Sequence, residues 1–165
     1  MKVEEFYQAL KKSGVDFASG VPCAAQKRIL HHFMTDPEMT YVQVAREEDA
    51  IGVAAGACLA GKKPIAIMQN SGLANSINSL ASLCIPYEIP VLVLATWRGH
   101  PDDRGEVPYH LVTGRSIISM LSDLGIPAHV ISSEDPEKAI SDSMGDLSEK
   151  RIPSVMLLMR RGILE

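Results

Sequence analysis

Three acidic residues stand in a row where a β-branched run of the chain gives way to a run of small residues: Glu47, Glu48 and Asp49. The pattern places them at the junction of a predicted strand and a predicted helix. Carboxylates at a helix start offset the positive end of its dipole, and capping alone explains any one of them. Because the preceding run is apolar and expected to be buried, the first acid, Glu47, could instead lie in a partly dry cleft. A carboxyl group there can keep a raised pKa and exchange a proton with a ligand nitrogen.

A second polar junction is the segment Gln69-Asn70-Ser71-Gly72, which leaves an apolar run and opens a predicted helix. Unpaired backbone N–H groups and short polar side chains at such a place can bind an anion or a carbonyl oxygen. Simple capping by Asn70 or Ser71 explains the same residues. Both interpretations stay open on the sequence alone.

The polar segment from Arg98 to His110 is long for a connection in an α/β protein, where about 2–6 residues are usual. Loops of this length are often lids or binding loops, and this one carries Arg98, His100, Arg104 and His110. A solvated turn is the alternative.

The small-residue helix predicted over Asp49–Ala60 contains two interior glycines, Gly52 and Gly56. Each glycine costs a helix about 1 kcal/mol relative to alanine, so a close approach by another helix or backbone should offset the cost. That approach could be packing inside the monomer or contact with another subunit, and the sequence does not separate the two.

The elements that must position these residues alternate regularly. Helices are expected near 3–13, 24–34, 49–60, 73–83, 111–124 and 136–149, and apolar strands near 15–21, 39–45, 64–69, 90–97, 128–132 and 154–159. Continuous apolar strands are typical of a parallel sheet covered on both faces. We therefore predict a three-layer α/β fold, an about six-stranded parallel sheet with helices on both faces, in one domain over 1–165. The polar junctions then meet at the carboxyl ends of the strands, where such sheets bind ligands.

Composition narrows the class of protein. The chain has 165 residues, 46% of them hydrophobic, and a net charge of -4 without a basic block, which argues against a nucleic-acid partner. Its three cysteines lack C-x-x-C spacing, so neither a disulfide framework nor a zinc site is expected. The acidic, amphipathic N-terminus is unlike a signal peptide, and the apolar runs are too short to span a membrane. A cytoplasmic protein is expected. Nucleotide-binding glycine fingerprints and hydrolase elbows are absent from the sequence, which argues against a nucleotide-binding module.

The motifs together resemble the pyrimidine-binding domain of thiamine-diphosphate enzymes. Glu47-x-x-Ala50 looks like that family's Glu-x-x-Ala segment, whose glutamate hydrogen-bonds the aminopyrimidine ring of the cofactor. Within the family the chain is most similar to sulfopyruvate and phosphonopyruvate decarboxylases. The shared stretches are Gly20-Val21-Pro22, Arg46-Glu47-Glu48, Ala54-Ala55-Gly56, Met68-Gln69-Asn70-Ser71-Gly72 with Asn75-x-x-Asn78, Arg98-Gly99 and Leu124-Gly125-Ile126-Pro127.

The resemblance also implies a partner. Phosphonopyruvate decarboxylases usually read Val-Pro-Asp where this chain has Val21-Pro22-Cys23, and a second domain of theirs binds diphosphate and magnesium through Gly-Asp-Gly and a later Asn. Here the nearest approach is Gly145-Asp146-Leu147. The chain therefore looks like an alpha subunit of split sulfopyruvate decarboxylases, which serve coenzyme M biosynthesis in methanogenic archaea. A separate beta subunit would hold the diphosphate and Mg²⁺ in a hetero-oligomer, and no metal ligand is expected in this chain.

The resemblance and the placement of the polar junctions give the site residues their expected roles. Glu47 is the expected catalytic residue, because it would share a proton with a ring nitrogen of the cofactor. The residues expected to bind thiamine diphosphate are Glu47, Val21, Pro22, Gln69, Asn70 and Ser71. The residues expected to bind a small anionic 2-oxoacid are Asn70, Ser71, Arg98 and His110. In the alternative for Arg98, it pairs with Asp102 or Glu106 and only stiffens the loop.

The implied function is decarboxylation of 3-sulfopyruvate, and four other functions stay open, the first of which is a phosphonopyruvate decarboxylase. A transferase or an oxidoreductase of the same cofactor class could have split subunits too. A non-catalytic partner domain is also possible, although such a domain has no use for Glu47.

Overall fold

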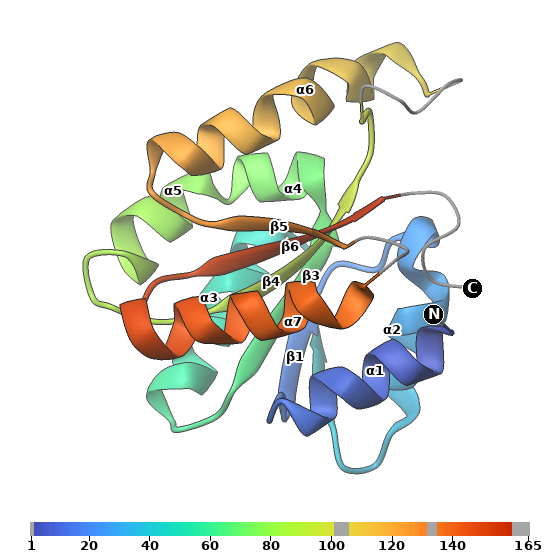
Figure 1. Ribbon diagram of the computed structural model, residues 1–165, viewed down its shortest axis with the longest axis vertical. Helices are drawn as coiled ribbons and strands as arrows, with labels where there is room; N and C mark the ends of the chain where they lie inside the picture. The colour runs from blue at the N-terminus through green and yellow to red at the C-terminus, as the bar shows by residue number, and fades with distance from the viewer. Residues whose placement is uncertain (1, 101–105, 132–134, 160–165) are drawn as a thin grey trace.

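A computed structural model gives the structure of residues 2–100, 106–131 and 135–159 (Figure 1). Within these ranges the chain forms a six-stranded, all-parallel sheet in the order β2-β1-β3-β4-β6-β5. The strands are β1 (Phe17–Gly20), β2 (Thr40–Gln43), β3 (Pro64–Gln69), β4 (Leu92–Trp97), β5 (Ala128–Ile131) and β6 (Ser154–Met159). The longer helices are α1 (Val3–Lys12), α2 (Lys27–Thr35), α3 (Glu47–Leu59), α4 (Asn70–Asn75), α6 (Pro108–Asp123) and α7 (Pro136–Gly145). The predicted fold class is confirmed.

Helices cover both faces of the sheet, and each face has its own core. Alternate residues of β3 point to opposite sides: Ile65 and Ile67 join the core under α1, α2 and α7, whereas Ala66 and Met68 join the core under α3, α4 and α6. Figure 1 shows α4 and α6 on one side of the sheet and α1 and α7 on the other. Because both faces are covered, β4 is buried along its whole length, which explains its continuous apolar sequence.

The outer strands are shorter and more exposed than the central ones. β3, β4 and β6 have six residues each, and β1, β2 and β5 have four. β2, which precedes Glu47, forms one edge of the sheet, with Thr40 and Gln43 exposed. The expectation that this strand is buried was wrong, because its β-branched composition suits an edge as well as a centre.

The helix predicted over 73–83 is broken. It is made of α4, the short α5 (Ile77–Ser79) and a π-helical turn, η2 (Leu80–Cys84). The break falls at Ser76, whose hydroxyl donates a 2.8 Å hydrogen bond to the carbonyl oxygen of Gly72. Serine side chains that bond to the backbone in this way compete with the regular helix and often bend it.

The loop after β4 is shorter than predicted, because α6 begins at Pro108 rather than at Leu111. Proline suits the first helical position, since its fixed φ is helical and its missing N–H would have no partner there. His110 therefore lies on the first turn of α6 and not at the end of a loop. Asp102 and Arg104 fall outside the described residues.

Three further observations concern the described residues. None of their helices has the length and apolar character needed to cross a bilayer. Cys23, Cys58 and Cys84 are all free thiols, and burial raises the pKa of Cys84 to about 11. Asp135 caps the start of α7, since its carboxylate accepts a 3.0 Å hydrogen bond from the backbone N–H of Lys138.

Candidate active site at the carboxyl ends of the strands

The polar junctions meet as the parallel sheet predicts. A pocket of about 300 Å³ opens beyond the carboxyl ends of β1, β3 and β4. Five of the expected site residues line it together with Cys23 and Ala24: Val21, Pro22, Glu47, Gln69 and Arg98. The other three, Asn70, Ser71 and His110, lie behind this first layer and bond to it. Cys23 and Ala24 were not among the expected site residues, and they line the pocket because they follow the end of β1.

The pocket distinguishes Glu47 from the two acids beside it. Arg46 forms ion pairs with Glu48, at 3.0 Å, and with Asp49, whose carboxylate accepts two hydrogen bonds from its guanidinium. The carboxylate of Glu47 has no hydrogen-bond or ion-pair partner among the described residues, although its side chain is half-buried in the pocket wall. Glu48 and Asp49 are therefore occupied at the helix start, and Glu47 alone of the three offers its carboxylate to the pocket.

Gly72 on α4 makes room for the Glu47 side chain. A Cβ atom added to Gly72 would overlap the Cγ, Cδ and Oε1 atoms of Glu47. Any other residue at position 72 would therefore force the carboxylate away from its present place. The requirement for glycine here is steric, and it links two segments that lie on neighbouring helices.

Asn70 fixes the backbone of Arg98. Its side-chain amide donates to the Arg98 carbonyl oxygen at 2.9 Å and accepts from the Arg98 backbone N–H at 3.1 Å. Asn70 is only 1% exposed, so this pair of bonds uses the polar atoms of a side chain that is nearly closed off from solvent. The arrangement joins the ends of β3 and β4 and aims Arg98 at the pocket.

Glu106 is the centre of the charged network behind the pocket. Its carboxylate accepts hydrogen bonds from Arg98 Nε at 2.6 Å and from a terminal guanidinium nitrogen at 2.8 Å. The same carboxylate lies 3.0 Å from His110 Nδ1. The Glu106 side chain is 1% exposed, and the hydrogen bonds from Arg98 hold its pKa well below the usual range. Of the two pairings considered for Arg98, the one with Glu106 is present.

The network continues from His110 to the pocket wall. His110 Nε2 lies 3.3 Å from the amide nitrogen of Gln69, and the same nitrogen donates to Ser71 Oγ at 2.7 Å. The amide oxygen of Gln69 faces the thiol of Cys23 at 3.7 Å. His110 therefore reaches the pocket through Gln69.

Two glycines allow α6 to approach the end of β4. Gly99 has a φ of +74°, and a Cβ atom there would overlap the carbonyl oxygen of His110. A Cβ atom on Gly114 would overlap the carbonyl oxygen of Gly99. Trp97 strengthens the contact, because its indole N–H donates to the Gly114 carbonyl oxygen at 2.7 Å. This close approach brings Glu106 and His110 next to Arg98.

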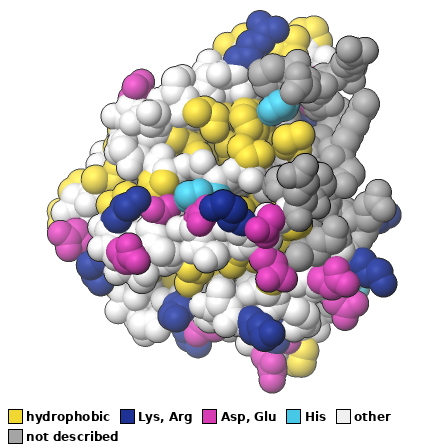
Figure 2. Space-filling view, in the orientation of Figure 1, with side chains coloured by type: hydrophobic (Ala, Val, Ile, Leu, Met, Phe, Trp, Pro, Cys, Tyr) yellow, Lys and Arg dark blue, Asp and Glu magenta, His cyan; other side chains and the backbone are white. Residues whose placement is uncertain are grey.

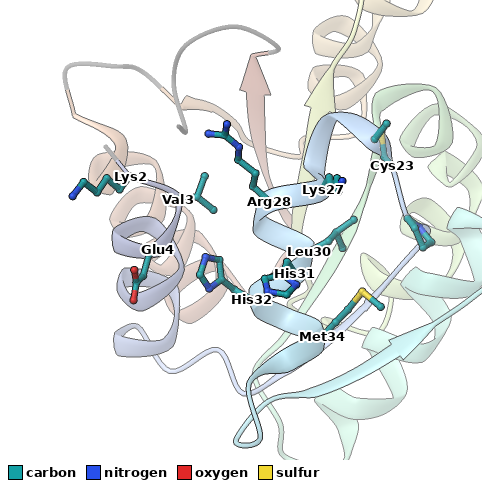
Figure 3. Close-up of a pocket in the computed structure, with 12 residues that line it drawn as sticks. Lys2, Val3, Glu4, Cys23, Lys27, Arg28, Leu30, His31, His32 and Met34 are labelled. Carbon is teal, nitrogen blue, oxygen red and sulfur yellow. The ribbon is translucent and has the colours of Figure 1, made fainter.

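A larger hollow, of about 850 Å³, lies between α1 and α2 (Figure 3). Figure 3 shows basic side chains around it, with Lys2, which precedes α1, on one side and Lys27 and Arg28 of α2 on the other. It shares Pro22, Cys23 and Ala24 with the Glu47 pocket, but none of the expected catalytic or substrate residues lines it. Its size alone therefore does not make it the active site.

Two exposed surfaces stand out on the described part of the chain. Gly52 and Gly56 are exposed on α3, and apart from the backbone of α3 itself no described atom lies within 4 Å of where their Cβ atoms would be. Among the described residues, therefore, nothing packs against these glycines. Figure 2 shows a second surface, where hydrophobic side chains gather between α6 and β5 above the mixed charges of α7. Ile118 of α6 and Val130 of β5 are exposed. Among the described residues, no group of three or more His, Cys, Asp or Glu side chains could hold a metal ion.

Comparison with known proteins identifies the class. Residues 2–114 match the family described as thiamine pyrophosphate enzyme, N-terminal TPP binding domain. The chain superposes on benzoylformate decarboxylase from Polynucleobacter necessarius with a TM-score of 0.81 at 20% identity, covering all of this chain and 31% of that one. The chain thus has the fold of the N-terminal domain of thiamine pyrophosphate enzymes, and it spans about a third of the solved structure.

Curated relatives narrow the family. The chain is 39% identical over 136 residues to the sulfopyruvate decarboxylase subunit alpha of Methanococcus maripaludis, which covers 82% of this chain and 79% of that protein. It is 35% identical over 147 residues to phosphonopyruvate decarboxylase of Streptomyces viridochromogenes, of which it covers 37%. The chain belongs to the sulfopyruvate decarboxylase alpha-subunit family of thiamine pyrophosphate enzymes.

Proposed function

We propose that this chain is a subunit of a cytoplasmic thiamine-diphosphate-dependent enzyme and that it binds the aminopyrimidine ring of the cofactor. The enzyme converts 3-sulfopyruvate to sulfoacetaldehyde and CO2 in coenzyme M biosynthesis. The observation that carries the proposal is the half-buried carboxylate of Glu47, which has no partner in the described chain and faces a pocket beyond the strand ends. The name of the M. maripaludis relative supports the choice of substrate.

The residues around Glu47 fit the aminopyrimidine end of the cofactor. The Glu47 carboxylate can share a proton with a ring nitrogen, and Gly72 keeps the space that this side chain needs. Val21 and Pro22 supply apolar wall, and Gln69 supplies a polar amide. Thiamine diphosphate, when bound, supplies the carbon nucleophile and accepts the electrons left by departing CO2.

The substrate's anionic end is assigned to the charged side of the pocket. Arg98 lines the pocket, and its backbone is held by Asn70. His110 and Ser71 act from behind, through their bonds to Gln69. In this proposal Arg98 favours a sulfonate over a plain methyl group, because a fixed cationic donor binds anions strongly, and His110 contributes indirectly by holding Gln69. Asn70, through Arg98, and Ser71, through Gln69, orient the carboxylate or the carbonyl group of the 2-oxoacid.

A beta subunit is proposed to hold the diphosphate and Mg²⁺, since the M. maripaludis relative is named as an alpha subunit. The exposed Gly52 and Gly56 on α3 support contact with that subunit, because a bare helix face allows another helix to approach closely. Of the two explanations open for these glycines, packing inside the monomer is not what the structure shows.

The test is a comparison of two neighbouring acids in the chain co-expressed with its beta subunit. Glu47→Gln keeps the size of the side chain but removes the shared proton, so kcat for sulfopyruvate should fall by about 10²–10⁴. Glu48→Gln is the matched control, since Glu48 pairs with Arg46 at the surface, and it should change kcat by less than about threefold. Equal losses in the two variants would contradict the assignment of Glu47.

Phosphonopyruvate is the second substrate to assay, because a phosphonopyruvate decarboxylase is among the relatives. A higher kcat/KM for phosphonopyruvate than for sulfopyruvate would indicate that phosphonopyruvate is the preferred substrate. Pyruvate serves as the substrate without an anionic 3-substituent.

A further inference from the structure

Glu106 makes contacts that neither the motif comparison nor the proposed catalytic roles explain. It is a glutamate with a nearly fully buried side chain, and it joins Arg98, which lines the pocket, to His110 on α6. Burying an ion pair costs desolvation energy and adds little net stability, so a structural role alone is a weak reason for such a network. The hydrogen bonds of Glu106 indicate which neighbouring side chains its carboxylate can orient.

The hydrogen bonds assign the proton positions along the network. Arg98 donates twice to Glu106, which therefore stays an acceptor-only carboxylate. His110 Nδ1, at 3.0 Å from this carboxylate, must then carry its hydrogen, which leaves Nε2 of a neutral ring as an acceptor. The amide nitrogen of Gln69 has two hydrogens, one for Ser71 Oγ and one for His110 Nε2. With these positions, each of the contacts named here pairs one donor with one acceptor.

We propose that Glu106 is a positioning residue of the active site: it fixes His110 as the Nδ1–H tautomer, and through His110 it holds the Gln69 amide with its oxygen toward Cys23 at the pocket. Gln69 and Cys23 both line the pocket beside Glu47. Glu106 thereby determines whether the pocket wall presents an acceptor or a donor at Gln69. What the pocket binds rests on the proposed function, whereas the tautomer does not.

The primary test reads the tautomer directly in the purified full chain. In protein labelled with ¹⁵N-histidine, long-range ¹H–¹⁵N correlation separates Nδ1–H from Nε2–H rings, and His110→Gln identifies the His110 signal among the five histidines. The wild-type ring should be the Nδ1–H form. In Glu106→Gln the amide would turn its oxygen to Arg98 and its NH2 to His110, which should convert the ring to Nε2–H. Glu106→Asp keeps the charge and should keep Nδ1–H.

The control for that measurement is Glu38→Gln, which removes an exposed acid paired with Lys11 and should leave the His110 signal unchanged. A wild-type His110 in the Nε2–H form would overturn the proposal, and this outcome needs no variant to fold. An unchanged Nδ1–H signal in folded Glu106→Gln would overturn it as well.

Kinetics of the complex with the beta subunit give the second readout. Glu106→Gln should lower kcat/KM for sulfopyruvate by about 10²-fold, the size expected when a misplaced group weakens alignment. His110→Gln should lose clearly less kcat/KM than His110→Ala, because a glutamine amide can still donate to Glu106 and accept from Gln69, whereas alanine can do neither. If His110→Gln and His110→Ala lose kcat/KM equally, the proposed positioning of Gln69 by Glu106 through His110 is wrong. If the wild-type complex decarboxylates none of the three acids, the proposed function fails while the tautomer measurement still decides the role of Glu106.

Discussion

At the scale of single residues, Glu47 and Gly72 depend on each other. The three atoms closest to a Cβ on Gly72 all belong to Glu47, so the cost of a side chain at position 72 comes from this one contact. The contact is local enough to be measured as a coupling free energy between two substitutions.

Gly72→Ala should therefore lower the free energy of unfolding by about 1–3 kcal/mol, as overpacking does in a buried site. In a Glu47→Ala background the same substitution should be neutral or stabilise by up to about 1 kcal/mol, because alanine favours a helix more than glycine. Urea unfolding of the four proteins measures both effects. Equal losses of unfolding free energy in the two backgrounds would show that the requirement for glycine at position 72 does not come from Glu47.

Residue types predicted part of the site and missed another part. Glu47, Gln69 and Arg98 were predicted because each follows a strand, and parallel strands bring their carboxyl ends to one edge. Glu106 was considered only as one of two acids that could pair with Arg98 and stiffen the loop. Its burial depends on α6 beginning at Pro108 and on the glycine contact between Gly99 and Gly114, which are tertiary facts that no local pattern encodes.

At the scale of elements, α3 has two differently occupied sides. Ala50, Ile51, Ala54 and Ala55 are buried against the sheet, whereas Gly52 and Gly56 are exposed, with no neighbour near their Cβ positions in the described ranges. Exposed glycines lower the stability of a helix relative to alanine. We propose that docking of a second subunit on this side of α3 offsets that cost.

Gly56→Leu should show this trade directly. The isolated chain should become more stable by about 0.5–1 kcal/mol, since leucine is the better helix former and the space is open. Binding to the beta subunit should weaken by at least about tenfold, because the added side chain keeps the partner at a distance. Calorimetry of the two subunits measures the affinity, with Gln8→Leu on the exposed side of α1 as the matched control. A less stable chain with unchanged affinity would place the glycine's role inside the monomer.

The order and type of the elements were predicted more accurately than their ends. Periodicity identified all six strands, because apolar runs bounded by glycine and proline are local signals. The break at Ser76 and the start of α6 at Pro108 depend on capping and on side-chain bonds to the backbone, which a hydrophobic pattern does not record.

At the scale of the whole molecule, the chain covers about a third of the solved enzymes that share its fold. The described residues supply an acid, an apolar wall and a polar amide for one end of a cofactor. Much of the binding energy of a diphosphate comes from cations and oriented N–H groups, which we assign to the beta subunit.

The isolated chain should consequently bind thiamine diphosphate only weakly, with a dissociation constant above about 100 μM, and addition of the beta subunit and Mg²⁺ should tighten binding by about 10²-fold or more. Titration calorimetry with and without the partner measures the difference. Micromolar affinity of the chain alone would refute the division of the cofactor between two subunits.

The short outer strands have a consequence for how copies of the chain meet. An edge strand presents a row of unpaired backbone groups that can recruit a strand from another molecule, and length makes it a better template. Both edges of this sheet, β2 and β5, are four residues long, whereas three of the four inner strands have six. The edges therefore offer few unpaired backbone groups for the sheet-to-sheet growth that leads to fibrous aggregates. Copies of the chain are expected to associate through helical surfaces instead.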